Sequence, residues 1–204
     1  MFERGFAIVP CVIEASEAES ALSELAAAGL CRSRAGARHI LDQPCVQKLA
    51  NDPRILGLSR RILGENSIPF RATLFDKSPN SNWLVVWHQD TALPLQEKRE
   101  TPGWGPWSIK DGVTYAHAPF KALEQILALR IHLDDSIETN GPLRVIPGTH
   151  VHGVLTDEEL QKLDSEIDPV TCAVGKGGVI AMRPLIVHAS NEITISSAAS
   201  SASH

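Results

Sequence analysis

The segment Asn82–Asp90, NWLVVWHQD, combines a strand pattern with two potential metal ligands. Branched and aromatic residues fill its first part, which predicts a β-strand. His88 and Asp90 follow two positions apart, and residues i and i+2 of an extended chain point to the same side. Both side chains can therefore reach one ion, and a divalent metal is the natural candidate.

A third ligand has to come from elsewhere in the chain, because one nitrogen and one oxygen hold a divalent metal poorly. His188 is the best candidate, since it ends a second apolar, strand-like run, Met182–His188. Two histidines and one carboxylate form the facial triad of non-haem Fe(II) oxygenases, which leaves positions open for a cosubstrate and dioxygen. A His-x-Asp pattern also arises by chance, and a histidine on an apolar strand can instead belong to the core.

A rival pair with the same spacing is formed by His150 and His152. These residues follow a Pro-Gly turn rather than a long apolar strand, and no carboxylate completes a site around them. We expect them to make structural hydrogen bonds.

Three parts of the chain together resemble the phytanoyl-CoA dioxygenase family of Fe(II)/2-oxoglutarate-dependent oxygenases. They are the His-Gln-Asp sequence at 88–90 after its tryptophan-rich strand, the segment NGPLRVIPGTH at 140–150, and the late His188. The resemblance runs from Phe6 to Ser190. It implies a double-stranded β-helix (a cupin-like jelly roll), Fe(II) held by His88, Asp90 and His188, 2-oxoglutarate and O2 as cosubstrates, and hydroxylation of a small or lipid-like substrate. The carboxylate at Asp90 argues against a halogenating variant, in which this ligand is replaced to admit a halide.

Composition indicates one globular domain, over residues 1–190, followed by a Ser/Ala-rich tail at 191–204 that we expect to be disordered. The chain has 204 residues, of which 43% are hydrophobic, enough for a sizeable core. A net charge of −5 without a basic cluster disfavours nucleic acid as a partner. No segment predicts a leader or a membrane span, and the four scattered cysteines suit free thiols. We therefore expect a cytoplasmic protein that acts on a small molecule, and the sequence carries no signal for an oligomeric state.

Helical patterns come first and strand patterns dominate afterwards, which indicates a mainly β fold with flanking α-helices. A capping box at Ser16–Glu19 opens the first predicted helix, which ends at Gly29, and a second box at Thr156 opens a helix through Leu163. Further helices are expected at Pro44–Ala50 and Pro53–Leu63. Strands are expected at Phe6–Ile13, Ile68–Lys77, Ile126–Leu133, Val170–Val174, Val179–Met182 and Leu185–His188.

The strand Ile126–Leu133 has two different faces. Leu127, Leu129, Ile131 and Leu133 line one face, which predicts a packed core, whereas Arg130 lies on the other face. A charged residue in the middle of a barrel strand needs a partner. The family resemblance places Arg130 where relatives carry a cosubstrate-contacting residue, so the partner is either an anionic cosubstrate or a structural ion pair.

Between Pro94 and Pro119 lies a stretch rich in glycine, proline and tryptophan. A loop of this length is commonly a lid or a binding loop, and it follows the His88/Asp90 pair directly. We expect a substrate-covering loop that uses Trp104 and Trp107. The alternative is a static hydrophobic flap that closes the end of the barrel.

The resemblance fails at the carboxyl end. It implies an arginine about ten residues after His188 that grips the far carboxylate of 2-oxoglutarate, but residues 196–200 are SSAAS. We therefore expect weak binding of 2-oxoglutarate and impaired activity, with Arg130 or Lys77 as partial substitutes. The alternative function is a jelly-roll protein that binds a metal or a small ligand without turnover.

Overall fold

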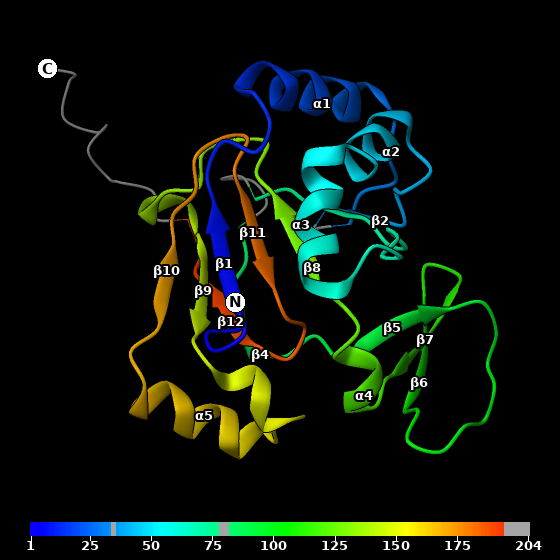
Figure 1. Cartoon of the computed structure of the whole chain (residues 1–204), viewed down its shortest axis with the longest axis vertical. Coiled ribbons are helices and arrows are strands. Elements are labelled where there is room, and N and C mark those ends of the chain that lie inside the picture. Colours follow the sequence, from blue (N-terminus) through cyan, green and yellow to red (C-terminus); the bar gives the residue numbers. More distant parts are fainter. Residues whose placement is uncertain (34–35, 78–81, 194–204) are drawn as a thin grey trace, which may run out of the picture.

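Two antiparallel sheets face each other and form the body of the molecule (Figure 1). The first has the strand order β1 (Phe6–Val9), β11 (Val179–Met182), β8 (Ala128–Ile131). The second has the order β10 (Val170–Cys172), β9 (Leu143–Ile146), β12 (Val187–Ser190), β4 (Val85–His88). The structure is a computed structural model and describes residues 1–33, 36–77 and 82–193, so the expected disordered tail lies outside the described residues from 194 on.

The main core lies between the two sheets, because each sheet turns its apolar side chains inward. The buried cluster joins both sheets and includes Phe6, Ile180 and Met182 from the first and Leu143, Val145 and Cys172 from the second. This arrangement is the jelly roll expected from the sequence. The predicted strand at Phe6–Ile13 is shorter than expected and ends at Val9, just before Pro10, and β1 lies at the edge of its sheet.

Helices cover the outer face of the first sheet. Leu129, Ile131 and Val179 pack there against Ala18 of α1 (Ala15–Ala27) and Ile55 of α3 (Pro53–Leu63), and α2 (Pro44–Ala50) lies beside them (Figure 1). The predicted capping box is wrong by two residues: the Glu17 carboxylate accepts the Glu14 amide hydrogen at 2.8 Å.

One helix covers the outer face of the second sheet. Leu160 of α5 (Asp157–Glu166) packs against Ile146 and Val187, with Trp87 at the edge of the cluster. The predicted capping box is confirmed, since Thr156 Oγ1 accepts the Glu159 amide hydrogen at 3.3 Å.

The stretch between Pro94 and Pro119 is not one long loop, so that prediction is wrong. It contributes to a separate sheet of order β5 (Ala92–Leu95), β7 (Val113–His117), β6 (Trp107–Lys110) (Figure 1). Asp111 and Gly112, with φ of 50° and 79°, form the tight turn between β6 and β7, and Asp-Gly is a strong hairpin signal. Pro94 is tolerated because β5 is an edge strand.

The remaining elements are short. The run expected as a strand from Ile68 to Lys77 forms β3 only at Thr73–Phe75, where it has β2 (Gly36–Arg38) as its partner. The helix α4 (Phe120–Leu123) precedes β8, and two 3-10 turns, η1 (Glu138–Asn140) and η2 (Thr149–His152), flank β9. Within the described ranges, none of the helices has the length and apolarity needed to cross a membrane.

Candidate metal centre

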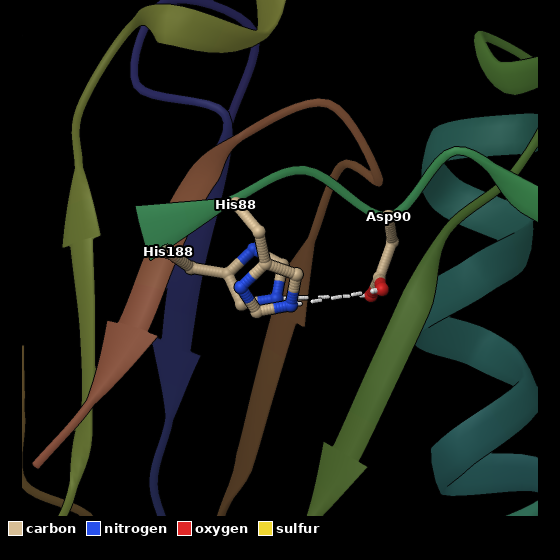
Figure 2. Close-up of side chains that lie close together, drawn as sticks. All are labelled: His88, Asp90 and His188. Carbon is tan, nitrogen blue, oxygen red and sulfur yellow. Dashed lines mark ion pairs between the residues drawn. The ribbon is translucent and has the colours of Figure 1, made fainter. Parts of the chain in front are cut away.

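Two neighbouring strands bring the predicted ligands together. His88 is the last residue of β4, and its partner across the strand pair is His188 of β12. Asp90 follows just beyond β4 and points back toward the two imidazole rings (Figure 2). One ligand atom from each residue lies within 4.8 Å of the others, and in the described part of the chain this is the single cluster of at least three such groups.

The hydrogen bonds of the two histidines leave the correct ring nitrogen free. Nδ1 of His88 lies 2.9 Å from the carbonyl of Val86, and Nδ1 of His188 lies 2.9 Å from the carbonyl of Ile186. Because a carbonyl only accepts, each Nδ1 carries the proton and each Nε2 is left with a lone pair. Such a second partner fixes the tautomer and ring orientation of a metal-bound histidine.

The Nε2 atoms both face Asp90. They lie 4.0 Å (His88) and 3.7 Å (His188) from its two carboxylate oxygens. Burial lowers the pKa of His188, against the opposing effect of Asp90 and with a further lowering by His88, so its imidazole stays in the neutral form that metals bind. The donor set therefore fits Fe(II), with two nitrogens and one oxygen. The Asp90 side chain is 47% exposed, which leaves one side of the site open.

Gln89, a residue that sequence reasoning did not single out, clamps the turn between His88 and Asp90. Its amide nitrogen donates to the carbonyls of Gly153 at 2.9 Å and Leu185 at 2.7 Å, and its oxygen accepts the Leu155 amide hydrogen at 2.8 Å. The backbone of Asp90 is held too, because its amide donates to the carbonyl of Pro184 at 2.9 Å. The sequence signal that could have identified Gln89 was its position between two predicted metal ligands.

The Pro-Gly-Thr-His segment positions β12. Thr149 is fully buried, and its hydroxyl donates to the Ile146 carbonyl at 2.8 Å and accepts the Val187 amide hydrogen at 2.9 Å. His150 lies 3.0 Å from the Phe2 carbonyl through Nε2, which agrees with the structural role expected for it. The segment thus ties the end of β9 to the strand that carries His188.

Arg130 and Lys77, the predicted cosubstrate contacts, lie near enough to each other for the charge of Arg130 to contribute to the lowered pKa of Lys77. Arg130 is paired with Ile180 across β8 and β11 and so faces the interior. The Lys77 ammonium donates to the Ser190 hydroxyl at 2.8 Å and to the Asn191 carbonyl at 2.6 Å. Both cations are therefore inside or at the rim of the barrel that holds the metal ligands.

The two tryptophans have different surroundings. Trp104 packs in a cluster with Leu93, Ala118, Leu123 and Leu185. Trp107 begins β6, and the Lys98 ammonium lies 6.0 Å from its ring. Its buried indole Nε1 has no hydrogen-bond partner among the residues that the structure describes. Leu185 connects the Trp104 cluster to the metal centre, because its carbonyl accepts from Gln89.

Fold and site together define the class of jelly-roll proteins with a two-histidine, one-carboxylate metal centre. The family model for phytanoyl-CoA dioxygenase matches residues 2–198, so the chain belongs to the phytanoyl-CoA dioxygenase family, as the sequence motifs indicated.

Among curated proteins, L-proline trans-4-hydroxylase from Streptomyces griseoviridis is 28% identical over 119 residues, which is 58% of this chain and 36% of that protein. Ectoine dioxygenase from Bordetella bronchiseptica is 28% identical over 112 residues, which is 55% of this chain and 29% of that protein. The chain thus spans about a third of the length of these relatives.

Solved structures show the same fold. EctD from S. alaskensis in its apoform superposes with a TM-score of 0.68 at 21% identity, over 94% of this chain and 69% of that one. The non-heme alpha ketoglutarate dependent carbocyclase SnoK from nogalamycin biosynthesis gives a TM-score of 0.67 at 18% identity, over 95% of this chain and 76% of that one.

Proposed function

We propose that this protein is an Fe(II)- and 2-oxoglutarate-dependent dioxygenase that hydroxylates a small or lipid-like molecule. The observation that carries the proposal is the convergence of His88, Asp90 and His188 on one point, with both Nε2 atoms free for a metal. Relatives support the class: the similar curated proteins are named as a proline hydroxylase and ectoine dioxygenases, and EctD has been crystallised with 2-oxoglutarate and 5-hydroxyectoine. The free Cys11 and Cys31, both exposed, suit the reducing cytoplasm.

Bound iron would couple the oxidative decarboxylation of 2-oxoglutarate to hydroxylation of the substrate. His88, Asp90 and His188 would hold the ion and would leave positions free for the cosubstrates. Gln89 and Thr149 keep the two ligand-bearing segments in register, and the neutral state of His188 keeps its lone pair available. The segment that carries Trp104 and Trp107 excludes water from the reacting centre in this proposal.

Release of succinate with consumption of 2-oxoglutarate tests the proposal. The full chain, loaded with Fe(II), should form succinate from 2-oxoglutarate and dioxygen, and faster when a compound that it can hydroxylate is present. Proline and ectoine are the first compounds to try. Asp90→Ala should abolish this, whereas Arg144→Ala, which removes a charge from the outer face of β9, should not. Iron binding without any succinate would instead support the non-catalytic metal-binding alternative.

A further inference from the structure

The short strand β3 has two faces, and one of them turns toward the barrel. Ala72 and Leu74 pack in a core cluster with residues of α1 and α2. Alternate residues of an extended chain point to opposite sides, so Thr73 and Phe75 point away from these helices. The Arg130 guanidinium, which faces the barrel interior, lies 5.7 Å from the centre of the Phe75 ring. This face of β3 therefore lines the barrel.

Two contacts fix the position of this segment relative to the metal centre. At one end, the Lys77 ammonium donates to the Ser190 hydroxyl, in the last residue of β12, at 2.8 Å. At the other end, Nη1 of Arg71 donates to the Ala92 carbonyl at 3.4 Å. Ala92 follows Asp90 by two residues, and two residues of extended chain span at most about 7 Å. The Arg71 guanidinium therefore lies beside the metal centre, at the end opposite to Lys77.

Arg71 differs from the neighbouring arginines in having no carboxylate partner. Arg38 of β2 pairs with Asp111 at 3.3 Å, and Arg32 pairs with Asp76. Among the residues that the structure describes, Arg71 makes no ion pair, and its single hydrogen bond is the long one to a backbone carbonyl. A guanidinium carries five N–H donors, and the Arg71 side chain is exposed. Most of these donors are therefore open to a ligand.

An apolar surface lies beside this cation. Because Ala72 and Leu74 point toward the helices, Arg71 shares the opposite face with Thr73 and Phe75. Phe75 is 59% exposed although it faces the barrel, and Thr73 is half-buried between the two. Sites for small molecules combine an apolar surface with a few polar groups that fix orientation. This face offers both, next to the metal ligands.

We infer that Arg71 selects the substrate, because its guanidinium binds a carboxylate of the molecule to be hydroxylated, whose apolar part lies along Thr73 and Phe75. The planar fork of an arginine matches the two oxygens of a carboxylate. The inference rests on the proposed function and deepens it, since it names the substrate class: a small carboxylic acid with an apolar body. The short distance between Arg71 and the segment that carries Asp90 limits the size of that acid.

Binding of matched probes to the full, metal-free chain tests the inference without turnover, since no metal is then present to bind a carboxylate. The probes are cyclopentanecarboxylate and phenylacetate, each compared with its neutral amide, and ligand-observed NMR measures their affinities. Each carboxylate should bind more tightly than its amide. Arg71→Gln should weaken carboxylate binding about 10-fold or more, the loss expected when a charged hydrogen bond is removed, and should change amide binding little. Arg61→Gln, at an exposed position of α3, is the matched control and should change neither.

Reversing the charge gives a second, independent result. Arg71→Glu should bind cyclopentylamine more tightly than cyclopentanecarboxylate, whereas Arg71→Lys should keep the preference for the carboxylate. The melting temperature of Arg71→Gln should equal that of wild type, since the side chain is exposed and makes one long hydrogen bond. A clear drop would show that the contact with Ala92 is structural and would overturn the inference. Equal binding of carboxylates and amides to the wild-type chain would overturn it too.

Succinate release by the loaded enzyme separates this inference from the proposed function. With Fe(II) and 2-oxoglutarate present, carboxylates should accelerate succinate release more than their amides do. Arg71→Gln should raise the half-saturating concentration of the carboxylate about 10-fold and change the rate at saturation much less, because a contact made equally before and during the reaction sets KM. A chain that releases no succinate under any of these conditions refutes the proposed function, and the carboxylate preference of the metal-free chain then still decides the role of Arg71.

Discussion

Replacing Gln89 by Met should remove the hydrogen bonds of this side chain and keep most of its volume. The side chain joins the turn between His88 and Asp90 to the carbonyls of Gly153 and Leu185 and to the Leu155 amide. Each hydrogen bond contributes about 1 kcal/mol net, so Gln89→Met should lower the free energy of unfolding by about 3 kcal/mol. For a chain of this size that corresponds to a drop in melting temperature of about 6 to 12 °C. Methionine fills a similar volume, so loss of packing contributes little.

The assay is urea unfolding of the metal-free chain, followed by anaerobic titration with Fe(II). Loss of the clamp should also weaken metal binding about 10-fold, the lower range found when supporting partners of metal ligands are removed. Gln47→Met, at an exposed position of α2, is the control and should change neither quantity. An unfolding free energy of Gln89→Met within about 0.5 kcal/mol of wild type, together with unchanged iron affinity, would refute this role for Gln89.

Three other outcomes follow from the structure. Proteolysis near Trp104 and Trp107 should slow when metal, 2-oxoglutarate and substrate are all present, because a covering segment becomes ordered over the filled site; equal cleavage with and without ligands would favour a static flap. Acid should destabilise the helical layer, because hydrogen bonds from Arg54 and then from the Glu14 amide lower the pKa of Glu17 from 4.5 to about 2. A depressed pKa gives stability that is complete above pH 4.5 and is lost as pH falls toward 2. The unfolding free energy of Arg54→Met, measured against pH, should therefore fall less over this window than that of wild type. Parallel curves would contradict the role of Arg54 in lowering the pKa of Glu17. Thr149→Val should lower the melting temperature and weaken Fe(II) binding, since the Val187 amide before His188 loses its buried acceptor; an unchanged metal affinity would show that β12 is held without it.

The sequence predicted the strands that carry the metal ligands better than the strands that carry none. The runs ending at His88 and His188 were identifiable because each combines branched residues with a polar residue at its end, and the faces of the Ile126–Leu133 strand were assigned correctly by alternation. The sheet formed by β5, β7 and β6 was missed, because glycine, proline and tryptophan masked the Asp111-Gly112 hairpin signal. The length of β3 depends on its pairing with β2, and the residues of β3 themselves do not indicate which strand they pair with.

The candidate site was predictable in its ligands and not in its supports. Spacing brings His88 and Asp90 to one side of a strand. The pairing of His88 with His188 is a tertiary contact, and the sequence indicated His188 only as a second histidine at the end of an apolar run. The three bonds of Gln89 reach backbone groups far away in the sequence, so no local pattern reveals them. The contact of Lys77 with Ser190 likewise joins residues 113 positions apart.

Iron occupancy of single variants tests the central claim most directly. Under anaerobic conditions, the wild-type chain should bind one Fe(II), and Asp90→Ala and His188→Ala should each lose most of that occupancy, because two ligands hold the ion poorly. His152→Ala, at an exposed histidine outside the cluster, should keep full occupancy. Full occupancy in Asp90→Ala, or a loss in His152→Ala as large as in His188→Ala, would contradict the assignment of His88, Asp90 and His188 as the metal centre.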